Sequence, residues 1–251
     1  MKRVLITRPQ ARADEMAEGL RAAGYEPILF PVIEIRAAEP NPDLDEALEH
    51  LGRYAWVVFT SANAVDIVFR NGQIDTAKEC MAHGVRVAAI GPKTASALQA
   101  RGVRPEFVPE EYVAEAILPG LGDVRGKRVL MPRAEIARKA LPEAIAAAGG
   151  VPHEVSVYQT LQAQPSPGAL AALRAGVHVI TLTSPSTVEN FMDIARKNGL
   201  DPLNLLGDPL IACIGPITEQ AAKKAGVTHL VVADEYTTEG VIRAIQMSVN
   251  S

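Results

Sequence analysis

The chain has few aromatic side chains, because tryptophan, tyrosine and phenylalanine make up only 4% of its 251 residues. Hydrophobic residues nevertheless make up 48%, so the core has to be built mainly from alanine, valine, leucine and isoleucine. That composition is typical of parallel strands that helices bury on both faces. An excess of charge of one sign is also missing, since 25 basic residues face 29 acidic residues.

Several classes of partner are disfavoured by what the sequence lacks. It has no basic block, no zinc-knuckle spacing and no apolar run near the roughly 20 residues of a membrane span. The apolar stretch after Met1 is too short for the core of a signal peptide. We therefore expect a cytoplasmic protein that binds neither nucleic acid nor membrane. Cys80 and Cys213 lie in apolar surroundings and are expected to be buried free thiols.

Motifs for cofactors and for common catalytic groups are missing as well. The five histidines are scattered without metal-ligand spacing. No GxGxxG or GxxxxGK[ST] turn is present, and no Ser/His/Asp or Cys/His arrangement stands out. The sequence therefore predicts a protein without metal, nucleotide or other cofactor.

An internal duplication dominates the sequence. The first half carries VLITRP, TSANAV, AAIGPKTASAL and EEYVAEAI, and the second half carries VLMPRA, TSPSTV, ACIGPITEQAA and DEYTTEGVI in the same order. Corresponding residues, about 124 positions apart, are Arg8 and Arg133, Thr60 and Thr183, and Gly91 and Gly215. Several motifs in register indicate a duplicated α/β unit.

Short apolar runs alternate with amphipathic stretches in both halves. The expected strands are 4–7, 56–60, 85–90, 129–131, 177–181, 210–214 and 229–232, and the expected helices are 11–23, 62–70, 92–100, 113–118, 137–148, 185–198, 216–225 and 238–247. This alternation predicts doubly wound parallel sheets of the Rossmann or flavodoxin type. Two runs, 31–37 and 155–161, extend the second strand of each half with no helix expected after them. They either pair antiparallel as a ribbon between domains or are separate edge strands.

The motifs, their order and their spacing from about Lys2 to Arg243 resemble the uroporphyrinogen-III synthase family. The resemblance implies two α/β domains with the active site between them, one formed by 1–35 plus 163–251 and the other by 38–161. The linker strands would be about 31–38 and 155–163. It also implies a cofactor-free, monomeric enzyme that closes hydroxymethylbilane, with loss of water and inversion of the terminal pyrrole ring. A transient contact with the preceding enzyme of the pathway belongs to the same expectation.

The expected substrate contacts lie at strand-to-helix turns, because helix N-termini at the carboxyl ends of parallel strands favour carboxylates. The candidate residues are Arg8, Thr60, Ser61, Gly91, Thr94, Arg133, Thr183, Ser184, Ser186, Gly215 and Thr218. Serine and threonine are also ordinary helix N-caps, and arginine often forms surface salt bridges, so a structural role for each stays open. Arg138 ranks below Arg8 and Arg133, because the turn before it, AEIA, lacks the glycine of the family pattern.

Tyr158 is the candidate catalytic residue, and it breaks the internal repeat because its counterpart is Ile33. A phenol with an ordinary pKa of about 10 stays protonated at neutral pH and can donate to a departing hydroxyl. The resemblance points to the same tyrosine, and a ring packed on the domain edge is the structural alternative. Tyr112 and Tyr236 are repeat partners expected to be structural or to lie at the rim. A two-domain module that binds a small anion without catalysis is the alternative function.

Overall fold

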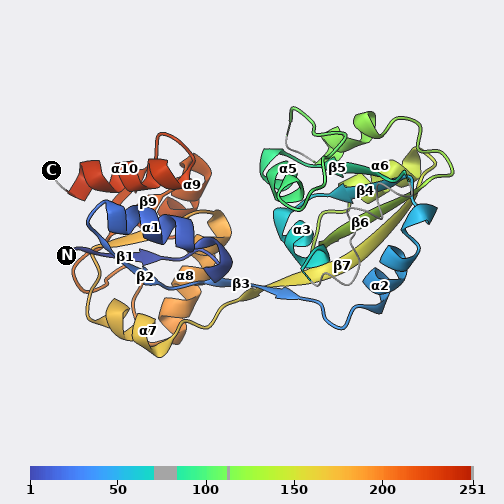
Figure 1. Cartoon of the computed structure of the whole chain (residues 1–251). Helices are drawn as coiled ribbons and strands as arrows, with labels where there is room; N and C mark the ends of the chain where they lie inside the picture. The colour runs from blue at the N-terminus through green and yellow to red at the C-terminus, as the bar shows by residue number, and fades with distance from the viewer. Residues whose placement is uncertain (71–83, 112–113, 250–251) are drawn as a thin grey trace. The chain divides into compact units, whose positions relative to one another are not determined.

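The computed structural model describes residues 1–70, 84–111 and 114–249, drawn in colour in Figure 1. Within it the chain divides into two compact units. Unit 1 combines Met1–Glu34 with Leu161–Ser251, and unit 2 is Ile35–Thr160. Cys80 and Tyr112, which the sequence singles out, lie outside the described residues. No described helix is long and apolar enough to span a membrane.

Unit 1 is a parallel five-stranded sheet covered by helices. Its strands are β1 (Arg3–Ile6), β2 (Glu26–Leu29), β8 (Val179–Leu182), β9 (Leu210–Cys213) and β10 (Leu230–Val232), in the order β10-β9-β8-β1-β2. All neighbouring strands are parallel. Counted along this unit, the order is that of flavodoxin-like folds, and it reverses between β1 and β8. Such a reversal is where ligands bind in folds of this kind.

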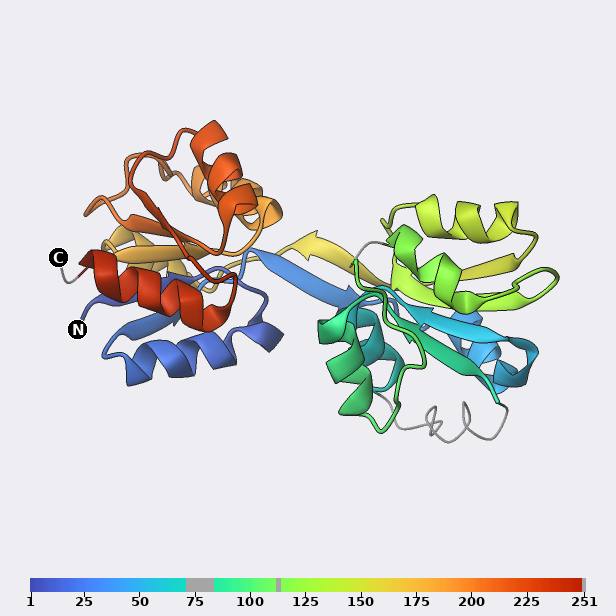
Figure 2. The same cartoon turned by 90° about the horizontal axis from the view of Figure 1, so that it is seen from above.

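The helices of unit 1 cover both faces of its sheet. They are α1 (Asp14–Ala22), preceded by the short 3-10 helix η1 (Gln10–Arg12), then α7 (Pro167–Arg174), α8 (Pro185–Lys197), α9 (Pro216–Lys224) and α10 (Thr238–Val249). In Figure 2, α1 in blue and α10 in red lie together on one face, and the orange helices lie on the other. β1 is fully buried from Val4 to Ile6, as a strand covered on both faces requires.

Unit 2 follows a similar plan and also has five strands. Its strands are β3 (Ile33–Ala37), β4 (Trp56–Phe59), β5 (Arg86–Ala89), β6 (Arg128–Ala134) and β7 (Val151–Gln162), in the order β3-β7-β6-β4-β5. β7, β6, β4 and β5 pair in parallel. An isolated parallel bridge between Ala88 and Phe107 stands where β10 stands in unit 1. The expected doubly wound α/β fold is therefore confirmed in both units.

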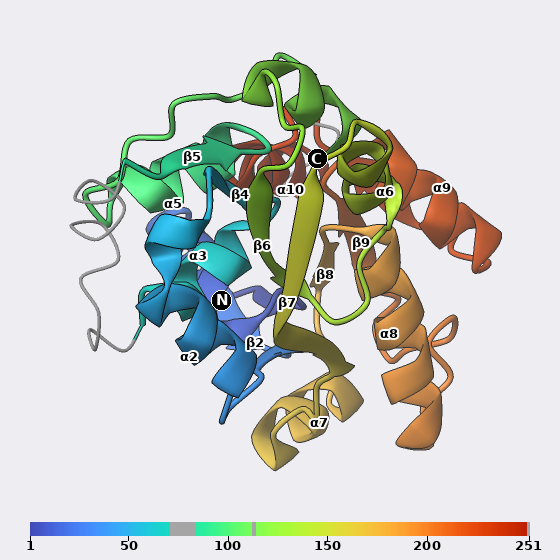
Figure 3. The ribbon, with the colours of Figure 1, turned by 90° about the vertical axis from the view of Figure 1, so that its right-hand side faces the viewer.

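The helices of unit 2 are α2 (Pro42–Glu49), α3 (Ala62–Val68), α5 (Pro92–Gln99) and α6 (Ala140–Ala147), with the 3-10 helices η2 (Leu51–Arg53) and η3 (Ala114–Leu121). Figure 3 shows β6 and β7 side by side, with α3 and α5 on one side of the sheet and α6 on the other. Pro119 lies inside η3, so the α-helix expected over 113–118 is replaced by a 3-10 helix.

The chain crosses between the units in β3 and β7. These strands are neighbours in the sheet, and two hydrogen bonds flank them: Ala38 N donates to Val157 O (2.9 Å), and Ala163 N donates to Val32 O (3.1 Å). A later residue on one strand thus pairs with an earlier residue on the other. That is the antiparallel pattern of the two arrangements expected. The boundaries of the domains and the linker role of these strands remain predictions.

A helix follows each crossing strand, so the expectation of none was wrong. α2 starts at Pro42 after Asn41, whose side chain accepts from Leu44 N, and α7 starts at Pro167 after the N-cap Ser166. Both prolines stand at the first helical position, where the missing N–H costs nothing and the fixed φ favours the helix. Proline near these positions suggests the end of regular secondary structure, but each of these prolines is the first residue of a helix.

Candidate functional site

The predicted polar residues of unit 1 lie at the carboxyl ends of its strands, on both sides of the reversal in strand order. Arg8 follows β1, and Thr183 and Ser184 follow β8, its neighbour in the sheet. Gly215 follows β9, the next strand along. The sheet topology therefore gathers at one edge residues that are far apart in the sequence.

Arg8 is a half-buried cation. Its Nη1 donates to Thr238 Oγ1 at 2.9 Å, and Thr238 is the first residue of α10. Burial lowers the pKa of the guanidinium below its ordinary value, and the nearby Glu15 carboxylate partly offsets this effect. An arginine stays protonated in spite of such a shift. A partly desolvated positive charge held by a neutral hydroxyl is suited to bind a carboxylate.

The turn after β8 is a capping box. Ser184 Oγ accepts from Thr187 N at 3.2 Å, and Thr187 Oγ1 accepts from Ser184 N and from Thr183 N, both at 3.0 Å. The structural role left open for Ser184 is therefore real. Because these N–H groups are already bonded, a ligand here would meet the hydroxyls, and Ser184 Oγ and the exposed Ser186 Oγ lie 2.9 Å apart.

The predicted residues of the two glycine-proline turns are buried. Gly91 and Gly215 stand before α5 and α9, neither helix has a side-chain cap, and both glycines are buried. Thr94 and Thr218, within the first turns, are only 4% and 3% exposed. Their hydroxyls are therefore poorly placed for direct contact with a bulky ligand in this conformation.

In unit 2 the structure brings Tyr158 and Ser61 together. The Tyr158 hydroxyl, from β7, donates to Ser61 Oγ at 3.1 Å. Ser61 also accepts from Asn63 N at 3.1 Å and so caps α3, directly after the half-buried Thr60 at the end of β4. Tyr158 is 7% exposed, so its ring is packed while its hydroxyl reaches the strand-end turn. Both the packing role and the donor role expected of this tyrosine fit the contact.

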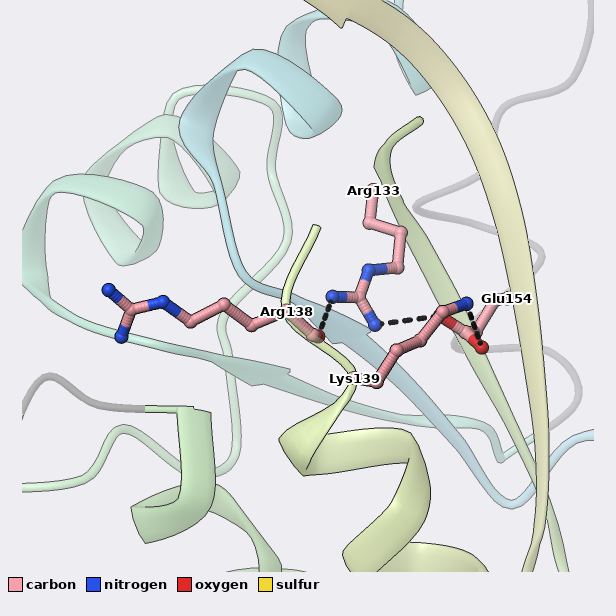
Figure 4. A network of polar contacts seen from close by, with 4 residues as sticks. All are labelled: Arg133, Arg138, Lys139 and Glu154. Carbon is pink, nitrogen blue, oxygen red and sulfur yellow. Dashed lines mark hydrogen bonds and ion pairs between the residues drawn. The ribbon is translucent and has the colours of Figure 1, made fainter. Parts of the chain in front are cut away.

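Arg133 is held inside the protein (Figure 4). Its Nη1 donates to Glu154 Oε2 at 2.8 Å, and its Nη2 donates to the carbonyl oxygen of Arg138. Lys139 Nζ contacts Glu154 Oε1 at 3.0 Å from the other side. The Arg133 side chain is 9% exposed, and its Nε is buried without a partner among the described residues. A substrate carboxylate would have to displace Glu154 to reach it.

The internal repeat explains why the two equivalent arginines differ. Met131 lies opposite Glu154 in the pairing of β6 with β7, and Ile6 lies opposite Leu29 in the pairing of β1 with β2. Leu29 thus takes the place that Glu154 takes beside Arg133. Glu154 was not among the predicted site residues, although it is the partner of Arg133. The internal repeat contained a signal for Glu154, because the repeat aligns this carboxylate with the apolar Leu29.

Arg138 differs from Arg133 in its surroundings. It is exposed, and Figure 4 shows its side chain pointing away from Glu154 while its carbonyl oxygen faces Arg133. The network therefore fixes the backbone of this turn and directs the Arg138 guanidinium outward.

Two other groups bear on the chemistry. Among the described residues no cluster of three or more histidine, cysteine, aspartate or glutamate side chains could hold a metal ion. Cys213, at the end of β9, is a free and buried thiol as expected. Burial, with a smaller effect of Glu219, raises its pKa from 9.0 to about 11. The thiol is therefore protonated at neutral pH and is a poor nucleophile.

Comparison with known proteins gives one consistent family. The family model described as uroporphyrinogen-III synthase HemD matches residues 14–243. The chain is 33% identical over 250 residues to the uroporphyrinogen-III synthase of Synechococcus elongatus, covering 98% of this chain and 94% of that protein. It is 32% identical over 255 residues to the putative uroporphyrinogen-III synthase of Methanothermobacter thermautotrophicus, covering 97% of each. The structure of Helicobacter pylori uroporphyrinogen-III synthetase has a TM-score of 0.62 at 17% identity, covering 99% of this chain and 100% of that one, which shows a common fold.

Proposed function

The chain belongs to the uroporphyrinogen-III synthase family, and from this premise we propose that its strand-end residues bind hydroxymethylbilane and direct its closure. The family is one of cyclising lyases in tetrapyrrole biosynthesis. The reaction joins the ends of a linear tetrapyrrole with loss of water and inversion of the terminal ring. In water the same bilane closes without inversion, so the protein has to select a geometry. Positioning of reacting groups can supply up to about 7–11 kcal/mol in the best intramolecular cases.

The observation that supports this proposal is the repeated hydroxyl-bearing turn at the reversal of strand order. Thr60 and Ser61 follow β4 in unit 2, and Thr183 and Ser184 follow β8 in unit 1, and all four residues are partly exposed. Each ring of the bilane carries an acetate and a propionate, which accept hydrogen bonds from hydroxyls and from arginine. Arg8 is the cation that we expect to contribute most.

Tyr158 is proposed to assist departure of the terminal hydroxyl. The electron pair of the adjacent pyrrole nitrogen expels this hydroxyl as the carbon–oxygen bond breaks, and the hydroxyl leaves as water once it gains a proton. The phenol of Tyr158 would supply that proton or a hydrogen bond, and Ser61 would hold the phenol in place. Because the pyrrole drives the departure, the residue is expected to help without being indispensable.

Three further expectations belong to the same proposal. The protein acts in the cytoplasm, it is a monomer, and it takes the unstable bilane during a transient contact with the enzyme that releases it. The family's place in a biosynthetic pathway supports the transient contact, and the location and the monomeric state are expectations from the sequence.

The test is a coupled assay. Hydroxymethylbilane is generated enzymatically in the presence of this protein, the products are oxidised, and the uroporphyrin isomers are separated by chromatography. We expect predominantly the type III isomer. Type I isomer alone, from a sample with native circular dichroism, would reject the synthase activity and favour a module that binds a small anion without catalysis.

A further inference from the structure

Tyr236 is an aromatic side chain that the proposed mechanism does not use. It lies in the segment between β10 and α10, at the carboxyl edge of the unit 1 sheet, and it is 66% exposed. Its hydroxyl makes no hydrogen bond within the described part of the chain. A single exposed aromatic is common on protein surfaces, so exposure alone assigns nothing.

The ring of Tyr236 covers Gly215. A Cβ added at Gly215 would lie 3.1 Å from Cδ1 of the ring and 3.4 Å from Cε1 and Cγ, which is tighter than most real contacts. The φ of Gly215 is −178°, an extended conformation open to any residue. A side chain at this position would therefore push the ring outward by a few tenths of an ångström, and the surface that a ligand meets at this turn is the tyrosine.

The segment that carries Tyr236 is anchored on both sides. Before it, Ala233 N donates to Cys213 O at 2.9 Å, which ties the segment to the end of β9. After it, Thr237 accepts from Val241 N at 3.1 Å and from Gly240 N at 3.0 Å, which ties the segment to the first turn of α10. The ring is thus presented by a fixed backbone, which lowers the entropy lost when a ligand packs on it.

The segment also leads directly to Arg8. Thr238, two residues after Tyr236, accepts the hydrogen bond from Arg8 Nη1 at 2.9 Å. The exposed aromatic ring therefore lies two residues from the hydroxyl that accepts from a half-buried cation. A pyrrole that bears a carboxylate offers matching chemistry, since its ring can stack and its carboxylate can pair with arginine.

The internal repeat supports the pairing of tyrosine with glycine. Gly91 and Tyr112 have the same sequence separation as Gly215 and Tyr236. Tyr112 lies outside the described residues, so the inference concerns Tyr236 alone. A ring that leaves most of its surface in solvent contributes little to packing, so packing does not account for the recurrence of this pair.

We propose that Tyr236 is a substrate-contacting residue that stacks on one pyrrole ring of the bilane, while Arg8 binds a carboxylate of the same ring. The proposal rests on the synthase function and names one part of its binding surface. Stacking of this kind is worth about 3- to 10-fold in affinity. Loss of the ring should therefore act on KM and leave kcat within about twofold.

The experiment compares Tyr236→Ala and Tyr236→Phe with a matched control. Leu206 is equally exposed at 66% and lies before β9, at the opposite end of the same sheet. In the isomer assay we expect Tyr236→Ala to raise KM about 3- to 10-fold, Tyr236→Phe to restore it toward wild type, and Leu206→Ala to match wild type. An unchanged KM in Tyr236→Ala overturns the proposal. Absence of type III product from the folded wild-type protein would instead reject the synthase function itself.

Gly215→Ala provides a second, independent measurement. A methyl group there has to displace the Tyr236 ring, so it should raise KM in the wild-type background. In the Tyr236→Ala background the obstacle is gone, and Gly215→Ala should add less than about twofold. An equal increase in both backgrounds would mean that the methyl group acts without the ring, and it would contradict the proposed surface.

Discussion

Replacing Glu154 with glutamine removes the carboxylate that pairs with Arg133 and leaves the size of the side chain nearly unchanged. Arg133 Nη1 and Glu154 Oε2 are 2.8 Å apart, and the two side chains are 9% and 28% exposed. At that distance an effective dielectric constant near 20 gives a gross attraction of about 6 kcal/mol. Most of this attraction only offsets the cost of removing both charges from water.

The expected loss of stability can be narrowed further. Truncating one partner of a fully buried pair costs about 3–5 kcal/mol, because the other charge is left unpaired. Glu154 is partly exposed, and glutamine keeps an oxygen that can accept from Arg133. We therefore expect Glu154→Gln to lower the free energy of unfolding of unit 2 by about 2–3 kcal/mol. The contact with Lys139, whose side chain is 65% exposed, should add little.

Trp56 makes unit 2 separately observable. It is the one tryptophan of the chain, it lies in β4, it is 1% exposed, and its Nε1 donates to Leu121 O at 3.0 Å. Urea unfolding followed by its fluorescence should therefore report unit 2. Glu219→Gln is the matched control in unit 1, because Glu219 is 24% exposed but pairs with Lys223, which is 60% exposed. It should cost less than about 1 kcal/mol and leave the tryptophan transition in place.

A double-mutant cycle tests whether the loss of stability in Glu154→Gln comes from the unpaired charge of Arg133. Arg133→Met removes that charge, so Glu154→Gln should cost at least about 1 kcal/mol less in the Arg133→Met background than in the wild type. Equal costs in both backgrounds, or a change below about 0.5 kcal/mol in the first variant, would refute the reasoning.

Three more outcomes follow from single residues. Tyr158→Phe should lower kcat more than any single serine- or threonine-to-alanine change while the far-ultraviolet circular dichroism stays native, and an unchanged kcat would remove the phenol from the mechanism. The pKa of Cys213 is raised from 9.0 to about 11, so the stability that its neutral thiol contributes is present below pH 9 and is lost as the pH rises toward 11. The stability difference between the wild type and Cys213→Ala should therefore shift against the wild type by about 2–3 kcal/mol between pH 8 and pH 11, and a constant difference in urea titrations would contradict the burial argument. Gly176 and Gly199 both have positive φ, at 87° and 72°, but only at Gly176 would a Cβ meet a carbonyl oxygen, that of Leu206 at 2.9 Å. Gly199→Ala should cost about 1 kcal/mol and Gly176→Ala at least that much again, and equal thermal midpoints would show that the crowding is relieved.

Much of the fold could be predicted because the signals for it are local or repeated. Apolar runs located the strands, and duplication of the motifs implied two similar units. The helices that start at Pro42 and Pro167 were missed, because a proline reads equally as a breaker and as a first helical residue. The 3-10 form of η3 depends on Pro119 and could have been suspected from that residue.

The site was less predictable, because its contacts depend on register between strands and on burial. The strand-end turns are local features, and the sequence identifies them. The hydrogen bond from Tyr158 to Ser61 joins residues that no local signal connects. Likewise, the burial of Thr94 and Thr218 depends on how each helix packs, and no local signal in the sequence reports that packing.

The divergence of the two repeats matches what the reaction requires. Closure with inversion treats one terminal ring differently from the others, so identical residues in the two repeats could not tell one end of the bilane from the other. The repeats differ at paired positions: Tyr158 aligns with Ile33, and Glu154, which neutralises Arg133, aligns with Leu29 beside the strand that leads to Arg8. One arginine is thereby ion-paired within unit 2, and the other donates to a neutral hydroxyl. We therefore expect Leu29→Glu to lower activity in the isomer assay, because the new carboxylate would neutralise Arg8. In that background Arg8→Ala should add little further loss. Full additivity of the two changes would show that Leu29 and Arg8 act independently.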